Sequence, residues 1–341
     1  MLLTTWFILW GVLWAVYFML DGFDLGLGTL LPVLARNETE KRIVYNAMGP
    51  FWDGNEVWLI TAGGVTFAAF PTTYAVMFSS LYSALLLILF ALILRGVSFE
   101  FRGNVDKPGW RFVWDSCLVF GSFLPALLFG VAFANIFHGI PIDGNGVYHG
   151  TLLTLINPYG LIGGLLFLFL FMVHGTNWLA IKSNGELKAR TVSLAKKLWV
   201  VLMVIAVVFL VATRYSTTLY NNYLKNPVLF MIPAITVGAL LLTRFFMAKN
   251  ASWKTWFCSG LTIVSATLFG VVGLYPNLLP SSLDPVHSLT VFNSSSSPLT
   301  LKIMLGVALT FVPIVLIYQA WVYHAFRYKV TEEDLAYEEA Y

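Results

Sequence analysis

Four carboxylates interrupt the first two long apolar stretches of this 341-residue chain. Asp21 and Asp24 stand near the end of the first stretch, in DGFDLGLG, and Asp53 and Glu56 stand at the start of the second, in FWDGNEVW. The members of each pair are three residues apart, so each pair shares one face of a helix. Because an ionisable side chain inside an apolar segment is costly in a membrane, it marks an ion or proton path by default.

The composition is that of an integral membrane protein. Hydrophobic residues make up 58% of the chain, charged residues 11% and aromatic residues 16%. A soluble domain carries about 25% charged residues, so this chain could not cover a water-facing surface. The aromatic content suits the belts at the two faces of a bilayer. The net charge of +3 does not indicate a nucleic-acid partner, and we expect none.

Nine segments are long and apolar enough to span a bilayer, which takes about 20 residues. They cover residues 4–30, 51–70, 74–94, 112–136, 157–181, 197–214, 227–246, 255–275 and 302–324. Pro71 predicts a tight turn between the second and the third. We therefore expect an all-α integral membrane protein with nine transmembrane helices.

Lys and Arg residues are divided unequally between the two sides of these spans. Arg214, Lys225 and Lys302 fall on one side, and the rest of the 20 fall on the other. The rich side comprises the connections at 31–50, 95–111, 182–196 and 247–254, the adjoining helix ends and the tail after 324. Because basic loops stay in the cytoplasm, we expect the N-terminus outside and the C-terminus in the cytoplasm.

This orientation places the carboxylates near the cytoplasmic side. Asp21 lies about 25 Å along the first helix from its outer end. Asp53 and Glu56 occupy the first turns of a helix that enters from the cytoplasm, and Arg95 and Glu100 follow the third span on the same side. We expect a cytoplasm-facing polar pocket in a four-helix unit, with Arg95 and Glu100 as charge partners of the acids.

The same acids also have a purely structural explanation. Pro50 suits the first turn of a helix, and acids in that turn complement the helix dipole, so Asp53 and Glu56 could do only that. Two other functions therefore stay open beside a proton path. One is a scaffold that supports a partner, and the other is a stand-alone proton-coupled transporter. A transporter places its substrate site near the midplane, where these spans carry no acid.

Haem and metal ligands are scarce in the sequence. Of the five histidines, only His174 lies within a predicted span. A lone histidine on an apolar helix is more often a packed polar residue than a ligand, and spacings such as CxxC or HExxH do not occur. We therefore expect this chain to ligate no haem and no metal.

The chain resembles subunit II of the cytochrome bd-type quinol oxidases over essentially its whole length. The resemblance rests on DGFDLGLG at 21–28, RNETEKR at 36–42, WDGNEVWLITAGG at 52–64, RGVSFEFR at 95–102, NPYG at 157–160, YPNLLPSS at 275–282 and the last span with Pro313. The block at 52–64 is highly specific.

The resemblance implies a haem-free subunit of a membrane terminal oxidase that reduces oxygen to water with electrons from quinol. Its partner would be a haem-bearing subunit I with two b-type haems and one d-type haem, in the bacterial cytoplasmic membrane. Membrane lipids and quinol would be further contacts, and a small single-helix accessory subunit stays open. Some relatives hold a quinone as a structural lipid in this subunit, and the sequence leaves open whether this chain does.

The resemblance also implies a proton path from the cytoplasm along the subunit interface. Asp53 matches the family's relay carboxylate, and Trp58 matches a tryptophan associated with it. Glu56 stands where some relatives carry Gln. Asp24 and Arg95 match further family positions. With Asp21 and Glu56 added from their spacing, the predicted path comprises Asp53, Trp58, Glu56, Asp24 and Asp21.

The fold implied by the resemblance is two four-helix bundles plus one peripheral helix. The predicted organisation is a first four-helix unit at 1–136, an outer loop at 137–156, a second four-helix unit at 157–275, an outer loop rich in Pro and Ser at 276–301, the last helix at 302–324 and an acidic cytoplasmic tail at 325–341.

Overall fold

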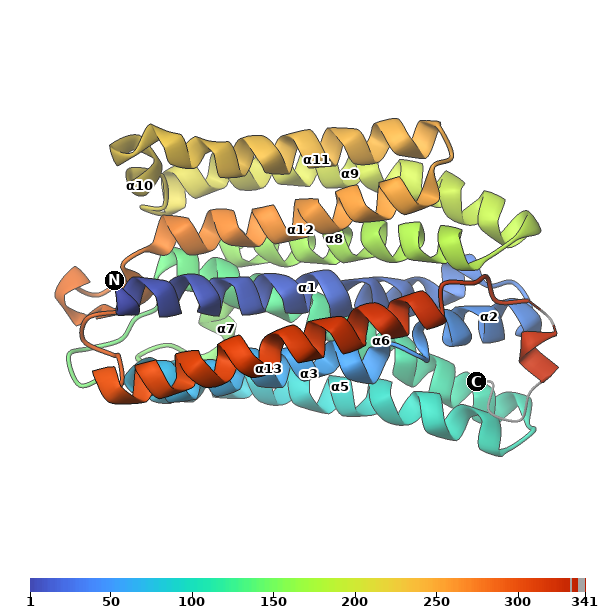
Figure 1. Ribbon diagram of the computed structural model, residues 1–341, viewed down its shortest axis with the longest axis horizontal. Helices are drawn as coiled ribbons and strands as arrows, with labels where there is room; N and C mark the ends of the chain where they lie inside the picture. The colour runs from blue at the N-terminus through green and yellow to red at the C-terminus, as the bar shows by residue number, and fades with distance from the viewer. Residues whose placement is uncertain (332, 337–340) are drawn as a thin grey trace.

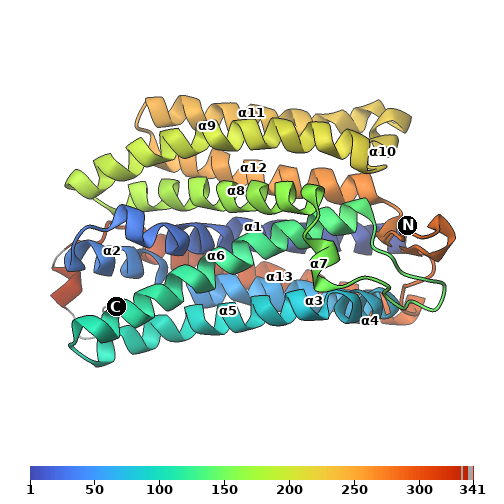
Figure 2. The same cartoon turned by 180° about the vertical axis from the view of Figure 1, so that it is seen from behind.

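The structure, a computed structural model, describes residues 1–331, 333–336 and 341. Long helices lie side by side along one axis, and the connections between them gather at the two ends (Figures 1 and 2). In chain order the elements are α1 (Leu2–Leu34), α2 (Glu38–Met48), α3 (Trp52–Ala69), α4 (Pro71–Ser80), α5 (Tyr82–Phe101), η1 (Arg102–Asn104), α6 (Pro108–His138), α7 (Leu152–Leu155), α8 (Pro158–Lys182), α9 (Gly185–Ser216), α10 (Tyr220–Lys225), η2 (Pro227–Phe230), α11 (Met231–Ala248), α12 (Ser252–Leu274), β1 (Asn277–Leu279), η3 (Pro285–His287), β2 (Leu289–Thr290), α13 (Pro298–Ala325) and η4 (Asp334–Ala336).

Eight helices within the described residues are long and apolar enough to cross a membrane. They are α1, α5 with η1, α6, α8, α9, α11 with η2, α12 and α13. The predicted all-helical, multi-pass membrane architecture is therefore confirmed. The predicted span at 51–70 corresponds to α3, which is not among the eight. The first turns of α3 carry Asp53, Asn55 and Glu56, and these polar residues lower its hydropathy.

The third predicted span differs from the observed helices at both ends. The chain becomes helical again at Pro71, breaks at Leu81 and continues as α5 to Phe101. Arg95, which we expected in a connection, therefore lies inside α5. A helix can continue through this buried arginine because its charge is paired with acids from neighbouring helices.

The expected connection at 182–196 is also mostly helix. Only Ser183 and Asn184 separate α8 from α9. The first turns of α9 bury Leu187, Thr191 and Ala195 on one side, so the helix extends beyond its apolar stretch as an amphipathic segment.

The loops and the described part of the tail carry little regular structure. The connection at 137–156, predicted to be an outer loop, contains the short helix α7, and the connection at 276–301 contains the antiparallel pair β1–β2. The predicted acidic tail falls partly on residues 332 and 337–340, which lie outside the described residues. The division into units predicted from the sequence stays a prediction.

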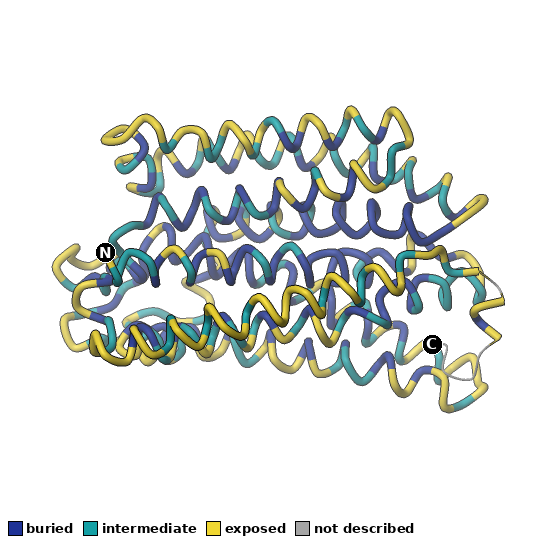
Figure 3. Tube along the Cα trace, viewed as in Figure 1, coloured by how far each residue is buried: buried dark blue, intermediate teal, exposed yellow. Residues whose placement is uncertain are grey.

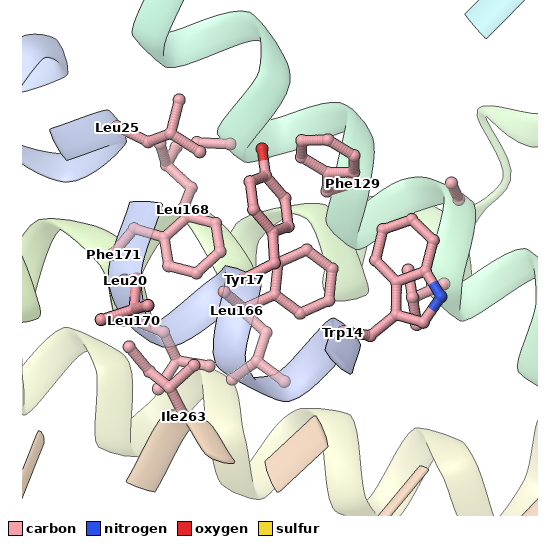
Figure 4. Close-up of a cluster of buried hydrophobic side chains, with 14 of the residues drawn as sticks. Trp14, Tyr17, Leu20, Leu25, Phe129, Leu166, Leu168, Leu170, Phe171 and Ile263 are labelled. Carbon is pink, nitrogen blue, oxygen red and sulfur yellow. The ribbon is translucent and has the colours of Figure 1, made fainter. Parts of the chain in front are cut away.

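The core forms around α1, which contacts α3, α6, α8 and α12. Figure 4 shows part of it, where Trp14 and Tyr17 of α1 meet Phe129 of α6 and apolar side chains of α8 and α12. The rings of Tyr17 and Phe129 pack edge to face with their centroids 5.4 Å apart. α1 touches helices from both halves of the chain. Its position therefore determines which side chains of the neighbouring helices can reach its polar residues.

Small residues, among them Gly22 and Gly26, allow α1 and α8 to approach closely. A Cβ at Gly26 would lie 1.9 Å from the carbonyl oxygen of Phe171, and a Cβ at Gly175 would lie 2.7 Å from the carbonyl oxygen of Phe23. Backbone therefore meets backbone at this crossing.

The least buried of the eight long apolar helices are α9, α11 and α13, whose surfaces are largely exposed (Figure 3). α13 buries only Leu301, whose carbonyl accepts a hydrogen bond of 3.0 Å from Nε1 of Trp6. At its other end, Nζ of Lys182 donates to the carbonyls of Phe326 and Tyr328. Polar contacts at its two ends thus hold α13 across α1 and α3 (Figure 1).

Candidate functional site

Polar side chains of α1, α3 and α5 meet in a buried ion-pair network. Nη1 of Arg95 lies 2.8 Å from Oδ1 of Asp21, and Nη2 of Arg95 lies 3.1 Å from Oε2 of Glu56. The side chains of Arg95 and Asp21 are 1% and 0% exposed, while that of Glu56 is 24% exposed. Two acids therefore share one arginine, and Glu56 is the member nearest to solvent.

A second polar chain begins at Asp24, one turn further along α1. Nδ2 of Asn55 donates to Oδ2 of Asp24 at 2.7 Å. Oδ1 of Asn55 accepts from Nε2 of Gln319 and from the hydroxyl of Tyr323, both at 3.0 Å. Oε1 of Gln319 in turn accepts from Nε1 of Trp58 at 2.7 Å. The chain thus links α1, α3 and α13 and connects Asp24 to Trp58.

Several buried polar atoms of these networks have no hydrogen-bond partner within the described part of the chain. They include Oδ2 of Asp21, Oδ1 of Asp24 and Nε of Arg95. Buried polar groups are normally hydrogen-bonded, often to an internal water. The unpaired atoms mark this region between α1, α3 and α5 as a place that suits ordered water.

Asp53 does not join the buried network. It is exposed, and its Oδ1 accepts from the backbone N–H of Gly54 at 2.6 Å. Glu56, three residues on, turns inward to Arg95. Glu100, predicted as a charge partner, is also exposed, and its Oε1 accepts from the hydroxyl of Tyr341 at 3.4 Å. The structure thus brings together Asp21, Glu56 and Arg95, and separately Asp24 and Trp58.

Sequence reasoning missed three members of the second chain: Asn55, Gln319 and Tyr323. Asn55 stands within the specific block at 52–64, yet only charged residues and one tryptophan were selected there. Gln319 is an amide within the last apolar span, and that contrast was the available signal. Tyr323 offers no such signal, because tyrosines are common near the ends of membrane spans.

A further charged cluster fastens α2 to the same end of the molecule. Asp115 accepts from Lys41 at 2.8 Å and from Arg102 at 2.7 Å. On the other side of α2, Glu40 accepts from Nη2 of Arg190 at 2.7 Å. Partial burial opposes the ionisation of Glu40, but the hydrogen bonds from Arg190 and from the backbone N–H of Arg36 outweigh it and hold the pKa of Glu40 below its usual range.

His174 lies in α8 with both ring nitrogens in hydrogen bonds. Nε2 lies 3.0 Å from the carbonyl oxygen of Met19, which can only accept, and Nδ1 lies 2.7 Å from the hydroxyl of Ser259. A neutral ring therefore donates at Nε2 and accepts at Nδ1. The ring also stacks on Trp256, with centroids 5.4 Å apart. Iron ligation would require one of these bonds to break. Over the described residues, no group of three His, Cys, Asp or Glu side chains could hold a metal ion.

Comparison with known proteins gives a consistent result. The family described as Cytochrome bd terminal oxidase subunit II matches residues 2–326. The chain belongs to this family. The predicted resemblance is thereby confirmed, and the chain is a multi-pass subunit of a membrane terminal oxidase.

Individual relatives extend over nearly the full chain. A "Probable cytochrome oxidase subunit 2" of Haemophilus influenzae is 39% identical, with 93% of this chain and 92% of the relative covered. The "Cytochrome bd ubiquinol oxidase subunit 2" of Bacillus subtilis is 36% identical, with 96% and 97% covered. The "Cytochrome bd-I ubiquinol oxidase subunit 2" of Escherichia coli K12 is 36% identical, with 97% and 95% covered.

A solved structure shares the fold. The bd oxidase from Geobacillus thermodenitrificans contains a chain that superposes with a TM-score of 0.74 at 15% identity, with 95% of this chain and 98% of that chain covered. The similarity at this identity concerns the fold alone.

Proposed function

We propose that this chain is the haem-free subunit of a quinol:oxygen oxidoreductase. Its partner, subunit I, would carry two b-type haems and one d-type haem, take electrons from quinol and reduce oxygen to water. Membership in the subunit II family supports this assignment, as do two relatives named ubiquinol oxidase subunit 2. The hydrogen bonds at both nitrogens of His174 favour haem ligation in the partner.

The finer architecture belongs to the same proposal. With 18 residues, α3 is about 27 Å long and would form a ninth span. α1, α3, α5 and α6 would form the first bundle, α8, α9, α11 and α12 the second, and α13 would be peripheral. The N-terminus would lie outside and the C-terminus in the cytoplasm of a bacterial cell membrane. Candidate contacts of the chain are quinol, lipids, a single-helix accessory subunit and a structural quinone.

The chain would also supply a proton-uptake path. Asp53 is open to the solvent at the end of the molecule where basic residues gather, so cytoplasmic water could protonate it. Val57 and Ile60, on the same exposed side of α3, are 52% and 71% exposed and form an apolar surface that the partner would cover. Behind Asp53, the acids Glu56, Asp21 and Asp24 and the indole of Trp58 line the polar end of the bundle, and Arg95 fixes their arrangement. The separation of Asp53 from this network means that a proton would pass through water or a partner side chain.

A purely structural role for these residues is the second candidate. Asp53 lies in the first turn of α3, where an acid complements the helix dipole, and within the described residues its carboxylate accepts the backbone N–H of Gly54. In that case the chain would scaffold subunit I without moving protons.

Replacing Asp53 separates the two candidates. We expect Asp53→Asn to leave assembly and haem content intact and to lower quinol oxidase turnover by about tenfold or more, because a proton relay contributes at least that much. Asp106→Asn, an exposed acid at the same end, is the matched control and should turn over normally. Normal turnover of an intact Asp53→Asn complex would leave the scaffold role.

Purification tests the oxidase assignment itself. The chain, extracted gently through a C-terminal tag, should bring a second large subunit and show haem b and haem d bands in a reduced-minus-oxidised spectrum. A colourless, folded chain without a partner would contradict the assignment and favour the transporter.

A further inference from the structure

A cavity of ≈480 Å³, lined by both apolar and polar side chains, lies where the α8–α9 turn meets the α11–α12 turn. Its polar lining comes from Asn177 on α8, Lys188 on α9, and Asn250, Ser252 and Thr255 around the start of α12. Both turns lie at the end of the molecule that carries α2 (Figure 1). The site is separate from the acids of the first unit and takes no part in the proposed proton path.

Two long helices begin at this cavity. α9 has 32 residues and begins at Gly185, whose φ of +54° suits glycine, and α12 has 23 residues and begins at Ser252. Neither helix has a side-chain cap on its first N–H groups within the described residues. The side chain of Asn184, at the cap position of α9, instead accepts from Nζ of Lys329 at 2.6 Å. Free N–H groups and the helix dipoles make both starts favourable for an anion.

Asn177 gives an independent indication of a ligand. It lines the cavity, is 3% exposed, and its Nδ2 has no hydrogen-bond partner anywhere in the described chain. A buried amide donor left unpaired is destabilising, so an acceptor in this cavity would be favoured. Lys188 adds a positive charge to the wall. The nearest acid in sequence, Glu186, lines a neighbouring cavity with Asn37.

We propose that this cavity binds a phosphate group, held by Lys188, Asn177 and the N-termini of α9 and α12. The phosphate could belong to an anionic phospholipid or to a soluble phosphate. Val192, Ala195 and Met247 form an apolar side of the cavity. Beyond them, α9 and α11 expose apolar surface that includes Val200 and Phe245, along which acyl chains would lie. The site therefore fits a lipid headgroup at the edge of the second unit.

Lipid binding to the purified oxidase complex tests this proposal. The complex, stripped of lipid in detergent, is mixed with phosphatidylglycerol or with inorganic phosphate, and bound adducts are counted by native mass spectrometry. We expect the parent complex to bind one phosphatidylglycerol saturably at this site. In Lys188→Gln and in Asn177→Ala the affinity should be lower by about tenfold or more, because each variant loses one charge-assisted hydrogen bond. Lys197→Gln, exposed on the same helix, is the matched control and should bind as the parent does.

The outcomes distinguish the two sources of phosphate. Saturable binding of inorganic phosphate with the same variant pattern, without lipid binding, would support the site and assign it to a soluble anion. Binding of neither probe, or equal binding by the parent, Lys188→Gln and Lys197→Gln, would overturn the proposal. Lys188 is partly exposed, so its variant keeps the test informative if the buried Asn177→Ala variant does not fold.

Discussion

Arg95 determines how the acids of three helices can coexist in an apolar setting. It pairs with Asp21 from α1 and Glu56 from α3 while lying inside α5. Removing charges from water is costly, and the attraction within a buried pair offsets that cost only when both partners are present. The arginine therefore ties α1, α3 and α5 together, whether or not protons pass beside it.

We predict that Arg95→Gln strongly destabilises the complex, by about 3–5 kcal/mol, because it leaves Asp21 buried without a counter-charge. Thermal unfolding of the purified complex and the yield of assembled protein measure the effect. Adding Asp21→Asn should restore much of the loss. Arg111→Gln, which breaks an ion pair with the exposed Asp106, is the control and should change little. Equal melting temperatures for the two single variants would contradict this role of Arg95.

At the scale of elements, the crossing of α1 and α8 sets the spacing between the two halves of the molecule. Gly22 and Gly26 of α1 lie against Phe171, and Gly175 of α8 lies against the backbone of α1. Close backbone approach gives more packing contact than two larger side chains would allow, and membrane helices associate largely through such contact. The same crossing holds His174 within hydrogen-bonding distance of Met19.

We predict that Gly26→Ala destabilises the fold by about 1–3 kcal/mol or more, because the added Cβ would meet backbone atoms that cannot move away cheaply. Gly238→Ala in α11, where a Cβ meets nothing within 4 Å, is the matched control. Thermal unfolding of the two variants should differ by several degrees. A Gly26→Ala protein as stable as the control would show that α1 and α8 can separate at little cost.

At the scale of the whole molecule, the two ends differ in charge. The basic connections, α2 and the α8–α9 and α11–α12 turns lie at one end, and the β1–β2 pair and α7 lie at the other (Figures 1 and 2). The charged clusters of Asp115 and Glu40 fasten α2 across the basic end. Basic residues kept on one side of a membrane fix the cytoplasmic face.

We predict that a cysteine at Ser282 reacts with a membrane-impermeant maleimide on intact cells, and that one at Lys107 reacts only after the cells are opened. Both positions are exposed and lie at opposite ends. The native Cys117 and Cys258 lie in α6 and α12, and the unmodified chain measures their background. The reverse labelling pattern would overturn the proposed orientation.

The sequence by itself determined the membrane class, most of the spans, the family and the set of acids near one side. These properties depend on local composition. The length of an apolar segment, the charge of a loop and a short motif can be recognised without knowing which helices are in contact. The same dependence on local composition explains why the predicted helix ends differ from the observed ones. Arg95 reads as a loop residue until its partners are known, and the basic start of α9 reads as a connection.

Only the tertiary structure decided which polar groups meet. The membrane helices are apolar nearly all round, so the sequence carries no amphipathic pattern that says which face turns inward. Asp53 and Glu56 therefore looked equivalent, although one lies in solvent and the other bonds Arg95. The pairing of Asn55 with Gln319 and Tyr323 depends on where α13 crosses α3, and helix packing, rather than any local signal, sets that crossing.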